Sequence, residues 1–494
     1  MSTRPPITLL LALALGVLLA ALDQSIVATA LPTVAGELGG ITDLAWVVTA
    51  YLVAETVSMP LYGKLGDVFG RKPVLLTAIG LFLTGSALSG LASSMLELAL
   101  FRALQGLGAG GLIVTAMAVI AELVPPQERA RYMGMIGGVF AVASIAGPLL
   151  GGLFVDELSW RWIFYVNVPV GAAALAVISA KLPARERTER KPVDLLGAGL
   201  LSAAAAATVL VASWGGKQYA WDSPTILVLA AMAVTAAVAF VAQERRAADP
   251  VLPLELFAGR AFSAASLSGF LAGAAMFGTV TFLPLYLQVV DGASATEAGL
   301  RMLPLVAGSL VAATISGRLV SKSRRYKAYP VAGAALITTG LFLMSGLDRH
   351  SSGVLTAVDM LTVGLGMGLV MQVVILIAQN HAPRRHMGVA TSTATFARAV
   401  GGSIGVAVLG AIFSSRLASE LGGLGPAADR IAGSGAHLDP EQVRALPAAL
   451  KPEVLTAFTH ALGITFTVGA AVAAAAMVGV ALLPRQLQPA AVAT

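Results

Sequence analysis

Long apolar runs, each about the length of a membrane-crossing helix, recur through this 494-residue chain. A bilayer core about 30 Å thick needs about 20 helical residues for each crossing. By this measure we expect fourteen crossings, at residues 7–30, 44–64, 73–93, 97–122, 131–155, 161–181, 193–213, 223–242, 261–290, 296–320, 328–347, 353–380, 387–415 and 457–483. Only 12% of the residues are charged, against roughly 25% in soluble proteins, which is too few to cover several soluble domains. The sequence therefore predicts an all-α polytopic membrane protein.

The distribution of basic residues predicts the orientation. If the N-terminus lies inside, most of the 32 Lys and Arg residues fall in inner segments, as the positive-inside rule requires. The first run contains Asp23, is longer than a signal-peptide core and lacks a cleavage site, so we expect a mature helix. Both termini are therefore predicted to be cytoplasmic. The net charge of +6 then reflects topology and contact with anionic membrane lipid, and nucleic acid is not an expected partner.

Two similar loops indicate an internal repeat. GKLGDVFGRKPV begins at Gly63 and GRLVSKSRRYKAYPV at Gly317, and each follows an apolar run. Duplicated six-helix halves are typical of membrane transporters. We expect an N-terminal bundle at 1–181, a linker with two additional helices at 182–260, and a C-terminal bundle at 261–494 that carries a long outer loop at about 416–456.

Residue types exclude several kinds of chemistry. There is no cysteine, the five histidines show no ligand spacing, and no Walker loop or HExxH motif is present. We therefore expect no metal, no cofactor other than protons as coupling ion, and no enzymatic activity. A membrane enzyme or sensor is the disfavoured alternative, because no catalytic set converges.

Four motifs in order carry a family resemblance. They are LDQSIVATALP from Leu22, GKLGDVFGRKPVL from Gly63, LALFRALQGLGAG from Leu98 and GGVFAVASIAGPLLGG from Gly137. With them the chain resembles the major facilitator superfamily, and within it the bacterial fourteen-span drug:proton antiporters. The resemblance implies a monomeric secondary transporter of the bacterial cytoplasmic membrane that exports lipophilic, cationic drugs by alternating access and confers antibiotic resistance. An exporter dedicated to one endogenous antibiotic or lipid, and an uptake symporter, are the alternatives; the fourth motif favours export.

Acidic residues inside apolar runs are candidates for proton coupling, since a charge in the bilayer centre is costly. Asp23 and Arg102 are predicted at similar depths in the first and fourth helices. Arg102 would favour the charged form of Asp23 and be released when Asp23 takes up a proton. The alternative is a purely structural ion pair. Glu55, in the second helix, is expected to bind a cationic substrate or a second proton, or else to face an aqueous cavity.

A substrate cavity is expected to be apolar with a few polar groups. Adaptable Met side chains suit the recognition of many ligands. The candidate lining residues, besides Glu55, are Met276, Phe277, Phe282, Tyr286, Gln288, Asp359, Met367, Met371, Gln372 and Arg398. The alternative is that these residues pack the core or face lipid.

The resemblance also implies a conformational latch in the loop that begins at Gly63. Asp67 would accept hydrogen bonds from a helix N-terminus of the other half and from an arginine such as Arg131. The other residues of this expected latch are Gly63, Gly70, Arg71 and Lys72. The alternative is a loop that only fixes topology.

The fifth predicted helix carries the antiporter motif. Gly147 and Gly151 are four residues apart, which leaves one helix face without side chains, and Pro148 removes a helical hydrogen bond. Together with Gly152, they predict a hinge or a tight seam between the halves, with ordinary helix packing as the alternative.

Overall fold

Helices make up most of the described chain. The computed structural model describes residues 6–38, 44–183, 194–216, 218–323, 326–422, 443, 446–447 and 450–481. The helices are α1 (Ile7–Leu38), α2 (Leu44–Phe69), α3 (Arg71–Leu91), α4 (Met95–Leu123), α5 (Pro126–Glu157), α6 (Trp162–Tyr165), α7 (Asn167–Lys181), α8 (Leu195–Trp214), α9 (Pro224–Glu244), α10 (Glu255–Ala258), α11 (Arg260–Val289), α12 (Ala295–Arg301), α13 (Leu303–Ser323), α14 (Ala328–Met344), α15 (Gly353–His381), η2 (Arg384–His386), α16 (Met387–Leu421) and α19 (Lys451–Ala481). Over these residues there is no strand beyond an isolated bridge between Gly215 and Tyr219.

A helix lies at each predicted crossing, but α2, at the predicted crossing 44–64, is not among the described helices apolar enough to be a candidate membrane span. By length and apolar composition, twelve of the described helices are able to cross a membrane, and α14 is a shorter apolar helix of 17 residues. The predicted crossing at 161–181 is divided into α6 and α7, and that at 296–320 into α12 and α13. Polar caps begin several of them; Ser94, for example, accepts a hydrogen bond from the Glu97 amide at the start of α4. The chain is thus an all-helical, multi-pass membrane protein.

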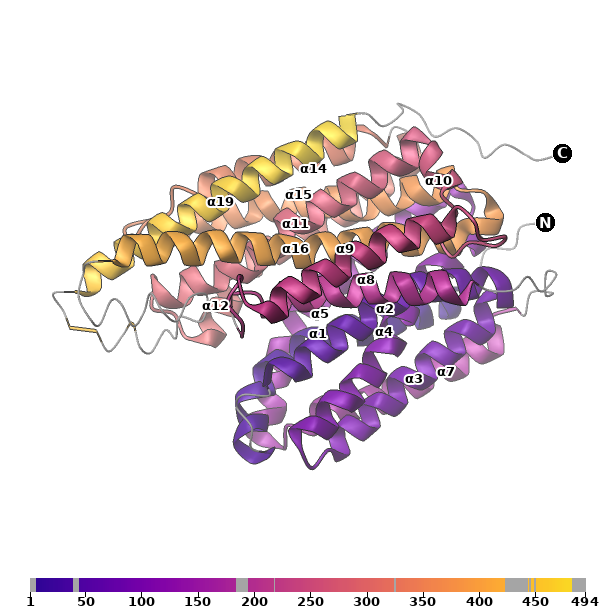
Figure 1. The fold of residues 1–494 in the computed structure, drawn as a ribbon, viewed down its shortest axis with the longest axis horizontal. Helices are drawn as coiled ribbons and strands as arrows, with labels where there is room; N and C mark the ends of the chain where they lie inside the picture. Colours follow the sequence, from indigo (N-terminus) through magenta and orange to yellow (C-terminus); the bar gives the residue numbers. More distant parts are fainter. Residues whose placement is uncertain are drawn as a thin grey trace.

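Two groups of helices form the molecule. One comprises α1 to α5 and α7, and the other α11, α13 to α16 and α19. Figure 1 shows them as an indigo-to-purple group and a salmon-to-yellow group, with α8 and α9 in magenta along one face. The helix α8 packs against α9, against α2 of the first group and against α16 of the second. The groups diverge away from the end where the N and C labels lie (Figure 1).

We call this end, where α2 meets α3 at Gly70 and where α16 begins, the basic end, because Lys64, Arg71 and Lys72 lie there. We call the opposite end the far end. Gly70 has a φ of 88°, which a glycine adopts without strain, and this conformation separates α2 from α3.

The closest backbone approaches between the two groups lie toward the basic end, in two seams. In the first seam, between α2 and α16, a Cβ at Gly63 would lie 2.1 Å from Ser392 Oγ and 2.8 Å from the Gly388 carbonyl oxygen. In the second seam, between α5 and α13, a Cβ at Gly317 would lie 2.5 Å from the Ala130 carbonyl oxygen. The two repeated loops therefore each begin with a glycine that permits contact with the other half.

Some predicted segments extend differently or lie outside the described residues. The last part of α16 continues to Leu421, beyond the predicted end at 415, and α19 begins at Lys451. Most of the predicted outer loop at 416–456 lies outside the described residues, as does the 184–193 part of the linker.

Candidate functional site

The Asp23 carboxylate is completely buried and is held by side chains from two other helices. Arg102 of α4 donates to its Oδ2 and forms an ion pair with it. Gln105 Nε2 donates to its Oδ1 over 2.8 Å, and Asn167 Nδ2, at the start of α7, lies 3.3 Å from the same oxygen. The predicted proximity of Asp23 and Arg102 is therefore confirmed, with two amide side chains added to the pair.

The Arg102 guanidinium is 2% exposed and is enclosed by further groups. It lies 4.0 Å from the centre of the Tyr51 ring of α2, which favours a cation in this position. Its Nη1 also donates to Gln105 Oε1 over 2.7 Å. A buried ion pair is stable only when other hydrogen bonds offset the loss of water; these contacts supply part of them, and Arg102 Nε has no hydrogen-bond partner within the described residues.

The amide residues were not among the predicted site residues. Gln105 lies three residues after Arg102 and so on the same face of α4, which is a signal readable from the sequence. Asn167 interrupts an apolar stretch, and its Nδ2 also donates to Ser86 Oγ of α3 over 3.0 Å. An isolated amide in such a stretch is costly unless it is paired, and this cost is the signal that would have identified it.

Glu55 forms a second buried acidic position, on α2. It is 4% exposed, and Gln24 Nε2 of α1 donates to its Oε2 over 2.5 Å. Its carboxylate interacts electrostatically with Asp23 and Arg102, and also with Arg398 of α16. The Arg398 guanidinium carbon lies 5.9 Å from the centre of the Phe140 ring of α5. Two predicted site residues of different halves, Glu55 and Arg398, therefore interact electrostatically without forming an ion pair among the described residues.

The predicted cavity residues of α11 have different surroundings. Phe277 is 44% exposed and lies against Gly402 of α16, whereas Met276 is buried. Phe282 packs against Phe413 of α16 at 5.5 Å between ring centres. These positions lie on one helix but on different faces, so they do not form a single lining.

Two aromatic residues are corrected from cavity lining to bundle packing. Phe282 contacts Phe413, which in turn contacts Phe458 of α19, so this stack lies inside the second group of helices. Tyr286 is fully buried, and its hydroxyl donates to the Asp348 carbonyl oxygen at the junction of α14 and α15 over 2.9 Å. Phe282 and Tyr286 therefore pack against residues of their own half and do not face the other half.

The α15 candidates are mostly buried. Met367 is 8% exposed, Gln372 is 3% exposed and Met371 packs partly buried against the core. Gln372 lies at the second seam, where its Nε2 would be 3.3 Å from a Cβ at Gly137 of α5. Asp359 is 1% exposed, and neither carboxylate oxygen has a hydrogen-bond partner within the described residues. Its carbonyl oxygen and Val363 lie against Gly340 of α14, inside the second group of helices. The remaining candidate, Gln288 near the end of α11, is half-buried.

Asp67 joins the two halves at the first seam. Its two carboxylate oxygens accept hydrogen bonds from the Gly388 and Val389 amides, at 3.0 and 2.9 Å, where α16 begins. It also pairs with Arg71, and Arg71 Nε donates to Glu122 Oε1 of α4 over 2.9 Å. A helix N-terminus favours an anion, so the carboxylate stabilises contact between the halves. Lys72 lies beside this group and is half-buried.

The expectation that Arg131 contacts Asp67 is wrong. Arg131 lies on α5, its main chain is next to Gly317 of α13, and its side chain is exposed. It therefore belongs to the second seam, because α5 packs against α13 while α2 packs against α16. The arginine that Asp67 contacts is Arg71, four residues later, at the start of α3.

The antiporter motif has two sets of neighbours: its first glycines, Gly137 and Gly138, lie against α13 and α15 of the other half, whereas Gly147 and Gly151 pack within their own half. A Cβ at Gly147 would lie 1.9 Å from Ser25 Oγ, and one at Gly151 would lie 2.1 Å from Thr29 Oγ1, both on α1. Nothing lies within 4 Å of a Cβ at Gly152, and α5 continues through Pro148 to Glu157. For Gly147 and Gly151, the predicted seam between halves is therefore corrected to a seam between α5 and α1.

An ion pair missed from the sequence links the central helices to the first half. Lys64 Nζ of α2 lies 2.8 Å from Asp249 Oδ1, in the segment between α9 and α10. Glu244, at the end of α9, accepts hydrogen bonds from the Val251 and Leu252 amides. The pairing of Lys64 joins positions 185 residues apart, as their numbers show, so no local pattern indicated it.

Sequence comparison shows that this chain is similar to membrane transporters. The family model of the Major Facilitator Superfamily matches residues 13–406. An uncharacterized MFS-type transporter of Mycobacterium tuberculosis is 47% identical over 411 residues, which cover 83% of this chain but 60% of that protein, less than two thirds of its length. Multidrug transporter protein MdtP of Bacillus subtilis is 38% identical over 83% of this chain and 75% of its own length. Multidrug resistance protein 3 of the same organism is 33% identical over 92% of this chain and 91% of its own length.

Solved structures share the fold at low sequence identity. The human organic anion transporter MFSD10 aligns with a TM-score of 0.65 at 16% identity, covering 97% of this chain and 100% of that chain. The proton:xylose symporter XylE aligns with a TM-score of 0.63 at 16% identity, covering 96% of this chain and 94% of that chain. At this identity the likeness concerns the arrangement of helices.

Proposed function

We propose, from the premise that this chain belongs to the major facilitator superfamily, that it is a proton-coupled exporter of lipophilic, cationic compounds. The family comprises membrane transporters, so the chain is a transporter and not an enzyme. Export is supported by the relatives named as multidrug transporters, which align over most of this chain. Proton coupling is supported by one observation above all, the fully buried Asp23 carboxylate paired with Arg102.

The proposed topology has fourteen spans in the bacterial cytoplasmic membrane. Two six-helix bundles would be joined by α8 and α9 as two extra central helices, and both termini would be cytoplasmic. The basic end, with Lys64, Arg71 and Lys72, would then face the cytoplasm, as the positive-inside rule favours. The protein would act as a monomer, and export of toxic compounds would confer resistance to antibiotics.

In the proposed mechanism, Asp23 carries the proton. A proton entering from the far end neutralises the carboxylate and removes its attraction for Arg102. Arg102 then keeps its contacts with Gln105 and Tyr51, while the charge attraction that holds α4 to α1 is lost. Loss of the proton to the cytoplasm restores the ion pair. Exchange of one proton for one singly charged substrate moves no net charge, so the pH difference supplies the energy, about 1.4 kcal/mol for each pH unit, which corresponds to a tenfold substrate gradient.

Glu55 would take the positive charge of the substrate. Its carboxylate is buried, accepts a hydrogen bond from Gln24 and interacts electrostatically with Arg398 of the other half. A bound cation would neutralise Glu55 and so weaken its attraction for Arg398, which lies on α16, the helix that forms the first seam with α2. Binding at Glu55 would thereby alter the contact between the halves. Because the two acids interact electrostatically, a cation at Glu55 would also favour loss of the proton from Asp23.

The Asp67 contacts would close the cytoplasmic side. Two charge-assisted hydrogen bonds to the α16 amides hold the halves together there, and each such bond contributes about 1.5–3 kcal/mol. In alternating access these bonds would have to break when the cytoplasmic side opens to admit substrate.

The test is dye efflux from proteoliposomes of purified protein, driven by an imposed pH gradient. Wild-type protein is expected to move a lipophilic cationic dye only when the gradient is present, and Asp23→Asn is expected to lose the gradient dependence. Glu37→Gln is the matched control, since Glu37 is also an α1 acid paired with an arginine, Arg161, but is 49% exposed. Gradient-driven efflux by Asp23→Asn at the wild-type rate would contradict the proposal.

A further inference from the structure

A cavity of about 430 Å³ lies at the basic end of the second half, away from Asp23 and Glu55. Its walls come from the segment before α11, from the start of α11 and from the end of α15 with η2. The lining residues are Pro253, Glu255, Leu256, Gly259, Arg260, Ala261, Phe262, His381, Pro383, Arg385 and His386. The proposed transport mechanism uses none of them.

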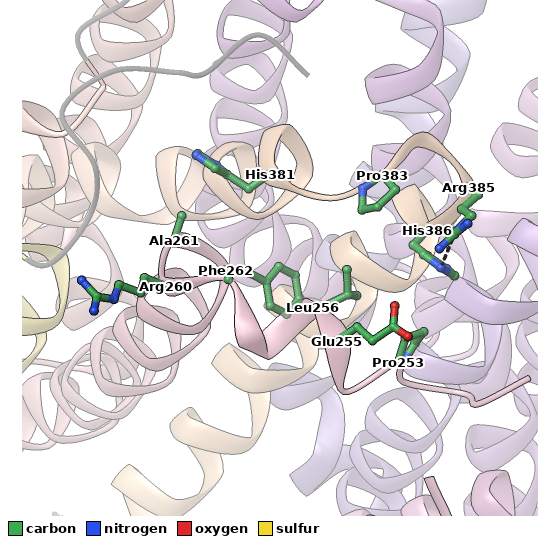
Figure 2. Close-up of a pocket in the computed structure, with 11 residues that line it drawn as sticks. Pro253, Glu255, Leu256, Arg260, Ala261, Phe262, His381, Pro383, Arg385 and His386 are labelled. Atoms are coloured by element: carbon green, nitrogen blue, oxygen red, sulfur yellow. Dashed lines mark hydrogen bonds between the residues drawn. The ribbon is translucent and has the colours of Figure 1, made fainter. Parts of the chain in front are cut away.

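The cavity combines an apolar floor with basic side chains. Leu256 and Phe262 are buried and occupy the middle of Figure 2, while Arg385 and His386 lie on one side and Arg260 and His381 on the other. An apolar floor with a basic rim fits a ligand that has an anionic group and an apolar body.

Arg385 and His386 form a basic pair on one rim. Arg385 Nε donates to His386 Nε2 over 3.0 Å, which leaves the two terminal nitrogens of the exposed guanidinium for an anion. Burial and the charge of Arg385 lower the pKa of His386, against smaller opposing effects of Asp67 and Asp249. The lowered pKa favours the neutral form of His386, so the positive charge of this rim is that of the exposed Arg385 guanidinium.

The start of α11 adds backbone donors to the same cavity. Gly259 precedes the helix without a side-chain cap, and the first helical hydrogen bond that it accepts comes from Ser263. The amides of Arg260, Ala261 and Phe262 precede that bond and belong to residues that line the cavity. Unsatisfied amides at a helix N-terminus, with the helix dipole behind them, favour phosphate groups.

We propose that this cavity binds the negatively charged phosphate group of an anionic lipid, with the start of the acyl or glycerol part against Leu256 and Phe262. The basic end would lie at the cytoplasmic headgroup region, where lipid phosphates are available. Arg385 contributes a charged donor in place, and the exposed Arg260 side chain reorients over the cavity from the other side. A soluble phosphate compound has the same anionic chemistry and is distinguished by the experiment.

Glu255 gives the proposal a test of opposite sign. It is the one acidic residue among those lining the cavity, and it is exposed. Its negative charge works against an anion, so Glu255→Gln is expected to strengthen phosphate binding, whereas Arg385→Gln and Arg260→Gln weaken it. A merely structural role for these residues would not produce opposite effects.

The experiment measures retained lipid by native mass spectrometry of the full chain after exchange into mixtures of phosphatidylglycerol and phosphatidylcholine, with inorganic phosphate titrated in a second arm. Arg385→Gln combined with Arg260→Gln is expected to weaken phosphatidylglycerol retention about tenfold or more, since a charge-assisted contact is worth at least that factor. Melting temperature without either ligand checks folding. Arg349→Gln is the matched control, because Arg349 Nε also donates to a neighbouring histidine, His350, over 3.0 Å, at the α14–α15 junction outside the cavity.

Each outcome decides the proposal. Preferential loss of phosphatidylglycerol in the cavity variants, with a gain in Glu255→Gln, supports a lipid phosphate; the same pattern with inorganic phosphate and no lipid preference supports a soluble phosphate. Equal retention by wild-type protein and the cavity variants would overturn the proposal. A loss of the same size in Arg349→Gln would overturn it too, because general surface charge would then explain the binding.

Discussion

Two aspartate–arginine pairs in this protein are built differently. Asp23 and Arg102 lie within one half, almost without exposure, and their remaining hydrogen bonds go to the amide side chains of Gln105 and Asn167. Asp67 and Arg71 lie at the basic end, and the carboxylate of Asp67 also accepts from backbone amides of the other half. In the proposed mechanism, the first pair changes its protonation inside one bundle, and the second makes and breaks contact between the bundles.

Removal of Arg102 is expected to have the largest effect. Arg102→Met leaves the buried Asp23 charge without its partner, and breaking a buried pair in this way destabilises a protein by about 3–5 kcal/mol. We expect a clear fall in melting temperature in detergent and loss of gradient-driven dye efflux. The double variant Asp23→Asn with Arg102→Met should recover most of the stability without recovering transport. If the double variant recovered both stability and transport, or if Arg102→Met lost no stability, the proposed difference between the buried pair and the pair at the basic end would be contradicted.

Substitution of Asp67 is expected to change conformation more than stability. Asp67→Asn removes the negative charge that faces the α16 amides and Arg71, so separation of the halves at the basic end should become at least tenfold more frequent. Spin labels at Pro73→Cys and Arg318→Cys, both exposed, report the distance, and the chain has no native cysteine.

The control for that distance measurement is Asp249→Asn. It removes an acid at the same end whose partner, Lys64, lies in the first half. It is expected to leave the label distance unchanged. An unchanged distance in Asp67→Asn as well would make the loop a topological signal and not a latch.

Filling the first seam tests the same contact by volume instead of charge. Gly63→Ala places a Cβ where Ser392 Oγ and the Gly388 carbonyl oxygen already lie, and such overpacking costs about 1–3 kcal/mol. The label distance at the basic end should lengthen, with a smaller population change than in Asp67→Asn. Gly80→Ala, where nothing lies within 4 Å of the added Cβ, should change nothing. Equal distances in both alanine variants would contradict the close approach of α2 and α16.

The smallest effect is expected at a third, exposed pair. Glu37 lies beyond the apolar Ile7–Val27 stretch of α1, and hydrogen bonds from Arg161 and Trp160 lower its pKa. Its stabilisation is present above the ordinary carboxyl pKa and is lost as the pH falls through the lowered value. Because the pair is exposed, Glu37→Gln should cost about 0–1 kcal/mol near neutral pH, and melting temperatures of variant and wild type should converge in acid. A loss of stability in Glu37→Gln as large as that in Arg102→Met would show that burial does not determine how much an acid–arginine pair contributes to stability.

Much of the fold was predictable, because apolar runs of about 20 residues with few charges rarely form anything other than membrane-crossing helices. The proximity of Asp23 and Arg102 was predictable as well, since their depths in antiparallel helices nearly coincide. The sequence did not indicate which helix faces which, so Arg131 was assigned to the wrong seam and Gly147 to the wrong neighbour. Small residues show that a close approach exists, but the partner depends on how whole helices pack.

The polar partners of the site were harder to predict for a related reason. Asn167 and Tyr51 each have apolar neighbours in the sequence, and their role appears only when α1, α2, α4 and α7 meet. Phe282 and Tyr286 illustrate the opposite error, in which packing residues are predicted to line a cavity. The sequence alone does not distinguish an aromatic side chain that lines a cavity from one that packs a helix bundle.

The most direct measurement of the central proposal is the release of protons when substrate binds. Purified protein in weakly buffered detergent solution is mixed with a lipophilic cationic dye, and the pH change is recorded. If Asp23 exchanges its proton for substrate, wild-type protein releases protons on binding, and Asp23→Asn binds the dye with no release attributable to that site. Equal proton release by wild-type protein and Asp23→Asn would contradict the assignment of coupling to Asp23.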